Sequence, residues 1–232
     1  MSLSSRIAMS LANYDNENSI GSRLRRNRVA PLLYLIEKAF LAHGQVSVVD
    51  IGGTRAYWNV IPVEFLRRNK VRVTVVNIPG TPLPQDDDMF IFRHGDGCNL
   101  SDIADRSFHI AMSNSVIEHV GDWPKMKQFA AEISRVARDY VVQTPNYWFP
   151  LEPHCWFPFF QWLPKPWKMM IVSQFELGYW PRAKSVDEAV QIVDSARLLN
   201  RKMFSALFTD ADIRTERIAL LPKSFVAVRD LG

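Results

Sequence analysis

Two acid–histidine pairs in the sequence have the chemistry of proton transfer. Glu152 and His154 lie two residues apart in an aromatic stretch, and Glu118 directly precedes His119. An imidazole, with an unperturbed pKa of about 6.5, suits a general base near neutral pH. We expect His154 and Glu152 to be the catalytic residues. A histidine that only hydrogen-bonds its own loop is the alternative for His154, and a cap between strand and helix is the simpler explanation of Glu118–His119.

The same stretch contains metal-ligand types in Glu152, His154 and Cys155. Three nearly adjacent loop residues rarely converge on one ion, so no metal site is expected from them. Cys98 and Cys155 are the only two cysteines, which excludes a disulfide-rich scaffold and a four-cysteine zinc site. Two free thiols favour a reducing compartment, and we expect a cytoplasmic protein.

Short runs rich in β-branched residues end in glycines or small polar residues. A glycine after a strand lets the backbone approach a ligand, although a plain tight turn explains a double glycine equally well. An amide or carboxyl group at such a strand end can meet ribose hydroxyls or an adenine amino group. The residues at these strand ends are Asp50, Gly52, Gly53, Asn77, Asp96, Gly97, Cys98, Ser113 and Asn114.

Strands and helices alternate through the first two thirds of the chain, which predicts an α/β fold with a mostly parallel sheet. Pro31 suits the first turn of a helix over 29–43, and Gly44 suits the end of that helix. Asp122 suits the N-cap of a helix that begins near residue 122. The expected strands are 46–51, 71–78, 89–92, 108–113 and 139–144, and the expected helices are 29–43, 57–69 and a segment from about 122 to 137.

The remainder of the chain has a different pattern. Residues 147–181 are rich in aromatic residues and prolines, and residues 185–204 look helical. Runs 213–220 and 225–228, joined by a turn at 221–224, predict an antiparallel hairpin. The aromatic stretch is either a lid for an acceptor or the core of a small helical insert. Its tryptophans also allow peripheral contact with a membrane surface.

Composition and charge exclude several classes. The 232 residues carry 28 basic and 24 acidic side chains, a net charge of +4, so neither a disordered chain nor a dedicated nucleic-acid binder is expected. No signal peptide or transmembrane segment is expected either. The densest basic run is explained by a solvated helix entry or by contact with an anion; it consists of Arg23, Arg25, Arg26 and Arg28.

Taken together, these motifs resemble a class I S-adenosylmethionine-dependent methyltransferase of the methyltransferase type 11 kind, over about residues 46–154. The resemblance is carried by VVDIGGT (48–54), GDG (95–97), DRSFHIAMSNSVIEHV (105–120) and QTPNYWFPLEPH (143–154). It implies a Rossmann-like three-layer αβα sandwich. Its seven-stranded, mostly parallel sheet would have the order 3-2-1-4-5-7-6, with strand 7 antiparallel and an aromatic-rich helical insert after strand 5.

The resemblance also implies S-adenosylmethionine as the cofactor and a role for each strand end. Asp50 and Gly52-Gly53 would border its methionine part, and Asn77 would face the ribose. Asp96, Gly97 and Cys98 would lie by the adenine, and Ser113 and Asn114 would line the floor near the sulfonium. The family commonly has a glycine where Thr54 stands and an acid where Asn77 stands.

We therefore expect methyl transfer to a small-molecule acceptor, either apolar or lipid-linked. A methyltransferase-fold protein with a degraded site, acting by ligand or protein binding, is the alternative that Thr54 and Asn77 suggest. A nicotinamide oxidoreductase is disfavoured because G-x-G-x-x-G is absent, and mild basicity disfavours a nucleic-acid methyltransferase. One domain is expected, divided into segments 1–45 (helical), 46–146 (cofactor core), 147–205 (lid or acceptor insert) and 206–232 (terminal hairpin).

Overall fold

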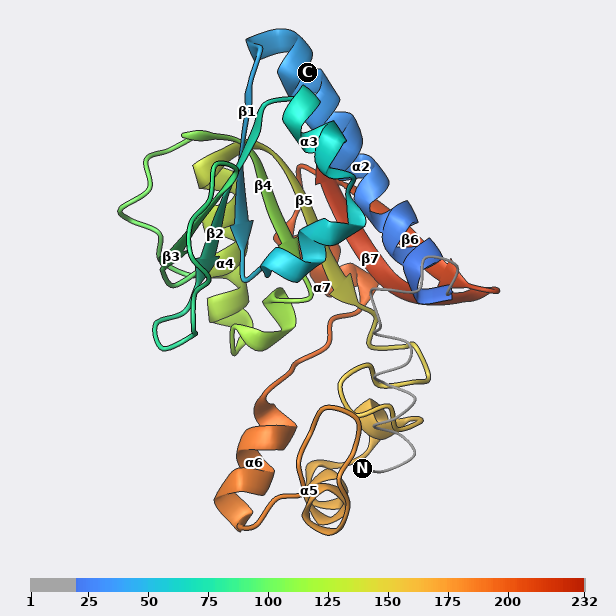
Figure 1. Cartoon of the computed structure of the whole chain (residues 1–232). Coiled ribbons are helices and arrows are strands. Elements are labelled where there is room, and N and C mark those ends of the chain that lie inside the picture. The colour runs from blue at the N-terminus through green and yellow to red at the C-terminus, as the bar shows by residue number, and fades with distance from the viewer. Residues whose placement is uncertain (1–19, 232) are drawn as a thin grey trace.

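A computed structural model describes residues 20–231, with side chains from residue 28 onward. Seven strands form one sheet in the order β3-β2-β1-β4-β5-β7-β6, with helices on both of its faces (Figure 1). The strands are β1 (Val46–Ile51), β2 (Val71–Asn77), β3 (Phe90–His94), β4 (Phe108–Asn114), β5 (Ala137–Pro145), β6 (Asp212–Ile218) and β7 (Leu221–Arg229).

The first five strands run parallel to one another, whereas β7 pairs antiparallel with both β5 and β6. The expected fold class, strand order and antiparallel seventh strand are all confirmed. In such a sheet the carboxyl ends of β1 to β5 lie along one edge, which is where α/β folds bind ligands.

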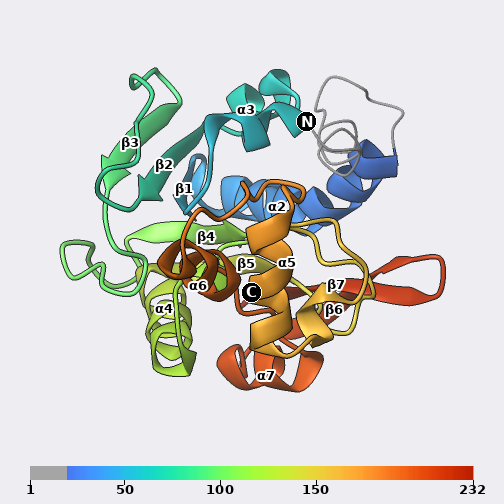
Figure 2. The same ribbon diagram turned by 90° about the horizontal axis from the view of Figure 1, so that it is seen from below.

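Helices form a layer on each face of the sheet. Seen from below in Figure 2, α2 and α3 lie on one face, while α4 and α7 lie on the other. The helices of these layers are α2 (Ile20–His43), α3 (Val63–Arg68), α4 (Trp123–Val136) and α7 (Arg201–Leu207), with short 3-10 turns η1 (Arg55–Val60) and η2 (Ile117–His119).

The two faces have separate hydrophobic cores because side chains alternate along each strand. In β1, Val48 packs with α2, whereas Val49 packs with α4. The apolar stripe of α4 includes Phe129 and Ile133, both fully buried. Parallel strands covered on both faces need apolar residues at almost every position, which explains the continuous β-branched runs.

The segment between β5 and α7 forms a smaller unit with its own hydrophobic cluster, which includes Cys155, Phe160 and Val172. It contains η3 (Phe160–Trp162), α5 (Lys165–Gln174) and α6 (Val186–Asp194). Figure 1 shows this insert beyond the carboxyl ends of the parallel strands. The division of the chain into four segments stays a prediction.

Several expected element boundaries are wrong. Helix α2 begins at Ile20, so Pro31 lies inside this helix and not in its first turn. The helix expected over 57–69 is divided into η1 and α3, because Pro62, with ψ 131°, has a non-helical backbone at the start of α3. The strand expected at 89–92 is β3, shifted by one to two residues.

The C-terminal third also differs. The helix expected over 185–204 is two helices, α6 and α7, separated by residues 195–200. The hairpin turn lies at Ala219 and Leu220, where Ala219 adopts a left-handed φ of 53°. Pro222 therefore lies within β7, opposite Arg217, at a register irregularity of the β6–β7 pair. Gly44 and Asp122 do end α2 and cap α4 as expected.

No helix within residues 20–231 combines the length and the hydrophobicity needed to cross a bilayer.

Two leucines of α2 test the assignment of its buried face. Leu35 is 1% exposed and Leu41 is 85% exposed. Leu35→Ala should lower the free energy of unfolding by about 2–5 kcal/mol because it leaves a cavity in the core. The same substitution at Leu41 should change it by less than about 0.5 kcal/mol. Urea denaturation of both variants checks this, and equal effects would contradict the assigned face.

Candidate functional site

The strand ends that carry the predicted cofactor residues are tied together by hydrogen bonds. The Asn77 side-chain amide donates to the Gly53 carbonyl oxygen at 2.9 Å, which joins the end of β2 to the loop after β1. The Ser113 hydroxyl donates to the Ile51 carbonyl oxygen at 2.9 Å, which joins β4 to β1. The structure therefore brings Asp50, Asn77 and Ser113 to neighbouring strand ends at one edge.

Both glycines after β1 are required by their surroundings. Gly52 has a φ of +76°, and a Cβ atom there would lie 2.6 Å from a methyl group of Val116. A Cβ atom on Gly53 would lie 1.8 Å from the Asp50 carboxylate. The double glycine thus combines a left-handed turn with close packing of the Asp50 side chain.

Asp50 is a buried carboxyl group with one engaged oxygen. Its side chain is 1% exposed, and the Trp58 indole N–H donates to Oδ2 at 2.8 Å. Within the described part of the chain, Oδ1 has no hydrogen-bond partner. Burial raises the pKa of Asp50 to about 7, although the Trp58 hydrogen bond works against this shift. No sequence pattern points to Trp58 as the partner.

The loop after β3 is a tight turn closed by Asp96. The Asp96 carboxylate accepts a hydrogen bond from the Cys98 backbone N–H at 2.9 Å. Asp96 is exposed. A Cβ atom on Gly97 would lie 2.8 Å from Ile51 and Phe129. The Cys98 thiol points inward and donates to the Lys125 carbonyl oxygen, and burial raises its pKa to about 11. Of these residues, Asp96 is exposed, whereas Cys98 is buried.

Asn114, at the end of β4, is held by a cation from α2. Arg28 donates to the Asn114 amide oxygen at 3.1 Å and forms a salt bridge with Glu216 of β6 at 2.9 Å. Arg28 therefore links α2 to β4 and β6. These contacts give Arg28 a structural role. The side chains of Arg23, Arg25 and Arg26 lie outside the described residues.

His154 and Glu152, the two expected catalytic residues, contact one another after β5. His154 Nδ1 lies 2.6 Å from Glu152 Oε1, and Glu152 Oε2 accepts from the backbone N–H groups of His154 and Cys155. Burial opposes ionisation of both groups, but their mutual hydrogen bond outweighs it: the pKa of Glu152 is lowered and the pKa of His154 is raised. Both Glu152 oxygens are engaged, so Glu152 positions His154, whose Nε2 points away.

His119 meets His154 from the loop after β4. Its Nε2 lies 3.0 Å from Nε2 of His154, with the two rings nearly perpendicular. Its Nδ1 lies 2.7 Å from the carbonyl oxygen of Ser195, which follows α6. Burial lowers the pKa of His119. This contact between the two histidines could have been found from the sequence motifs, because β4 and β5 are neighbours and each is followed by a histidine.

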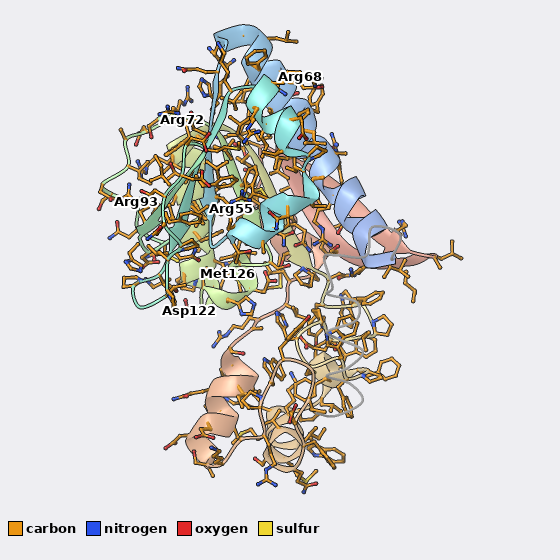
Figure 3. The ribbon with its side chains drawn as sticks, viewed as in Figure 1. Arg55, Arg68, Arg72, Arg93, Asp122 and Met126 are labelled. Atoms are coloured by element: carbon orange, nitrogen blue, oxygen red, sulfur yellow. The ribbon has the colours of Figure 1, made fainter. Side chains whose placement is uncertain are left out.

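The alternative explanation of Glu118 and His119 as a cap is wrong. Neither side chain caps a helix, and Asp122 caps α4 by accepting from the Lys125 N–H, at the start of this helix in Figure 3. Glu118 is 1% exposed, and its Oε2 accepts from the Thr144 hydroxyl at 3.0 Å. Its Oε1 has no partner among residues 20–231. Burial raises the pKa of Glu118 to about 7.

Cys155 does not complete a metal set with Glu152 and His154. Its side chain is fully buried in the core of the insert, and burial raises the pKa of its thiol. Both carboxylate oxygens of Glu152 already accept hydrogen bonds.

A hollow of about 600 Å³ lies at the opposite edge of the sheet, where β4 and β5 begin, and is lined by His43, Arg106, His109 and Arg138 among others. None of the residues singled out for cofactor binding lines it. The left-handed glycine turn and the polar strand ends lie at the carboxyl edge, which we therefore take as the candidate site.

The buried carboxyl group of Asp50 makes the free energy of unfolding depend on pH. Its pKa is about 7 in the folded chain and near 3.8 when unfolded, so between these values the folded chain holds a proton that the unfolded chain has released. Stability then falls as pH rises through this window, by at most about 1.4 kcal/mol per pH unit. Asp50→Asn keeps an acceptor for Trp58 but removes this dependence.

Urea denaturation from pH 5 to pH 8 measures the effect. The stability of Asp50→Asn relative to the unsubstituted protein should increase with pH and level off above about pH 7. Asp88→Asn, at an exposed position of the loop before β3, is the matched control and should show no such trend. Parallel pH profiles for Asp50→Asn and the unsubstituted protein would contradict the burial of a charge at Asp50.

Comparisons with known proteins give one family match. A family model described as a methyltransferase domain matches residues 60–140, about a third of the chain. No curated protein matches the sequence.

Solved structures with similar folds include an O-methyltransferase family protein from Burkholderia thailandensis (11% identity, TM-score 0.47, covering 91% of this chain and 58% of that one). Another is magnesium protoporphyrin IX methyltransferase from Synechocystis with bound SAH (9% identity, TM-score 0.46, covering 97% and 92%). A third is human N-acetylserotonin methyltransferase with SAM (13% identity, TM-score 0.47, covering 92% and 57%).

This chain thus spans under two thirds of the length of the first and third of these proteins, and likenesses this weak carry no argument about function. The likeness to methyltransferases rests instead on the sequence motifs, the strand order and the matched segment 60–140. Residues 60–140 thus match a methyltransferase domain, and the sheet has the strand order that the resemblance to class I S-adenosylmethionine-dependent methyltransferases implies.

Proposed function

We propose that this protein transfers a methyl group from S-adenosylmethionine to a small-molecule acceptor at the carboxyl edge of its sheet. The observation that carries the proposal is the set of polar groups left available after β1, β2 and β3, in a chain whose residues 60–140 match a methyltransferase domain. When bound, this cofactor supplies a methyl group already made electrophilic by its sulfonium.

The available groups fit the parts of the cofactor in turn. The unpartnered Oδ1 of Asp50 suits an ammonium group such as that of the methionine part. Because the Asn77 side-chain N–H already donates to Gly53, its amide oxygen is left to accept from a ribose hydroxyl. The second carboxylate oxygen of Asp96 can accept from an adenine amino group, because the first accepts from Cys98.

The acceptor is proposed to enter on the side of the insert, near His119 and His154. Holding acceptor and methyl group in line is the main contribution that the protein can make, worth roughly 7–11 kcal/mol in ideal cases. The insert exposes large apolar side chains, including Trp148, Phe159 and Trp167, which suits an apolar or lipid-linked acceptor. A cytoplasmic location and the absence of a nucleic-acid partner stay predictions.

The contacts of Asp50 and Asn77 support a second candidate function. Trp58 and Gly53 already satisfy part of the hydrogen bonding of these two residues. A protein that had lost catalysis could use the same contacts to keep a rigid loop, and would act by binding a ligand or a protein. Cofactor affinity separates the two candidates.

Asp96 gives the sharpest test of the cofactor site. Asp96→Ala should weaken binding of S-adenosylhomocysteine by about 10- to 150-fold, the equivalent of one hydrogen bond to a charged group, or about 1.5–3 kcal/mol. Isothermal titration calorimetry measures this, with Asp88→Ala as the matched exposed control from the loop before β3. Unchanged affinity in Asp96→Ala would remove Asp96 from the site.

His154 tests the acceptor side. His154→Gln should lower methyl transfer at least 10-fold while leaving the affinity for S-adenosylhomocysteine within a few-fold, because His154 belongs to the loop after β5. Transfer is measured with S-adenosylmethionine labelled on the methyl group and a metabolite extract as the source of acceptors. A transfer rate in His154→Gln equal to that of the unsubstituted protein would exclude His154 from the reaction.

A further inference from the structure

We propose that Glu118, His119 and His154 together bind a divalent transition-metal ion. One ligand atom from each of these side chains lies within 4.8 Å of the other two. The residues come from two places in the sequence, η2 after β4 and the loop after β5, which the sheet brings together. None of them belongs to the cofactor residues described above.

Hydrogen bonding at Nδ1 determines which nitrogen of each histidine is available. His119 Nδ1 faces the Ser195 carbonyl oxygen, which can only accept, so this nitrogen carries the proton. His154 Nδ1 faces the Glu152 carboxylate, and the same argument applies. In their neutral forms both imidazoles therefore present a lone pair at Nε2, the form in which histidine binds a metal.

The two Nε2 atoms face one another across 3.0 Å. With both Nδ1 atoms protonated, so short a distance fits either a proton shared by the two nitrogens or a metal ion bound by both. Nitrogens bound to one ion at about 2.1 Å lie roughly 3.0 Å apart at a right angle and roughly 3.4 Å apart in a tetrahedron. The distance between the imidazoles is therefore close to the spacing that a shared ion requires.

Glu118 supplies the third ligand and negative charge. It is 1% exposed, and its Oε1 is buried without a hydrogen-bond partner in the described part of the chain. Leaving a buried carboxylate oxygen unpaired costs free energy, and coordination to a cation removes that cost. The other oxygen accepts from Thr144, which orients the carboxyl group.

The groups behind the ligands resemble the outer shell of a metal site. Glu152 hydrogen-bonds the far nitrogen of His154, and the Ser195 carbonyl oxygen does the same for His119. Carboxylate and carbonyl partners of this kind fix the tautomer and the orientation of metal-bound histidines. The backbone N–H of Arg197 also donates to the Glu118 carbonyl oxygen at 2.7 Å. The ligands are thus held before any ion arrives.

The ligand set indicates the class of ion. Two imidazoles and one carboxylate suit Zn²⁺, Co²⁺, Fe²⁺ or Mn²⁺ better than the all-oxygen environments that Mg²⁺ and Ca²⁺ prefer. Three protein ligands leave coordination positions open, as in catalytic zinc sites. His119 is exposed, so an ion can reach the site from solvent.

An ion here would also define the acceptor, and this step rests on the proposed function. An open position can bind a hydroxyl oxygen of the acceptor and lower the pKa of that hydroxyl. The hydroxyl proton passes to solvent and a C–O bond forms to the methyl carbon. The S–C bond breaks with its electron pair moving to sulfur, which leaves S-adenosylhomocysteine. His154 then acts as a ligand and not as a base.

Metal binding to the full chain tests the proposal directly. The protein is treated with EDTA, dialysed, and titrated with Co²⁺ while its visible absorption is followed; Zn²⁺ is then added in competition. We expect one ion per chain with visible bands, displaced by one equivalent of Zn²⁺. Glu118→Gln, His119→Gln and His154→Gln should each weaken Co²⁺ binding at least 10-fold.

His43→Gln is the matched control, because His43 is exposed and its ring also lies beside that of another histidine, His109, 4.6 Å away. This variant should bind Co²⁺ as the unsubstituted protein does. Circular dichroism and thermal melting establish that each variant is folded; Glu118→Gln is nearly isosteric, so it keeps the test valid if a histidine variant unfolds.

Two results would overturn the proposal. The first is absence of Co²⁺ and Zn²⁺ binding at millimolar concentration, which would assign the contact between the imidazoles to a shared proton. The second is equal affinity for Co²⁺ in His154→Gln and in the unsubstituted protein. Titration with S-adenosylhomocysteine is run separately. Metal binding without S-adenosylhomocysteine binding would refute the proposed function and leave the metal site standing.

Discussion

The parallel pairing of β1 with β2 and β4, and of β4 with β5, is the constraint on which the rest of the structure depends. Parallel strands need long connections, and these connections place every carboxyl end at one edge. The motifs after these strands lie far apart in the sequence but meet there. The residues predicted to bind the cofactor gather around β1, whereas the histidines gather after β4 and β5.

The same edge concentrates polar groups that a folded core would otherwise exclude. Asp50 and Glu118 are each 1% exposed, and each keeps one carboxylate oxygen without a partner among the described residues. Such groups cost free energy in an apolar interior, and the surrounding packing must offset that cost. Buried carboxyl groups with raised pKa values are typical of binding and catalytic sites, although structural networks produce them too.

The two carboxyl groups differ in what surrounds them. Asp50 lies against Gly53 and accepts from Trp58, so it also shapes the loop that would approach a cofactor. Glu118 lies beside two imidazoles whose outer nitrogens are already occupied. We therefore propose two sites at this edge: one suited to an ammonium group and hydroxyls, the other to a metal ion.

Much of this arrangement could be predicted from the sequence. The β-branched runs predicted the α/β class, because buried parallel strands have a characteristic composition. The strand order came from the resemblance of the motifs to a known family. Glu152 and His154 were singled out from the sequence as candidate catalytic residues, and their hydrogen bond is visible only in the structure. Helix boundaries were less accessible: Pro31 is accommodated within α2, and Pro62, at the start of α3, divides the helix expected before β2.

The contacts that define the site were the least predictable part. Nothing local marks Trp58 as the donor to Asp50, Arg28 as the partner of Asn114, or the Ser195 carbonyl as the partner of His119. Each joins residues on different elements, and tertiary packing alone determines it. The meeting of His119 with His154 was accessible from strand order, but the burial of Glu118 was not, because a charged residue between strand and helix usually faces solvent.

The central claim is that the carboxyl edge around β1 and β2 binds an adenosyl cofactor. A crystal structure of the protein grown with S-adenosylhomocysteine tests it most directly. The account predicts the adenine beside Asp96, the ribose beside the Asn77 amide oxygen, and the sulfur near Ser113 and Asn114. Binding at the opposite edge, near His43 and Arg138, or absence of the ligand at millimolar concentration, would contradict it.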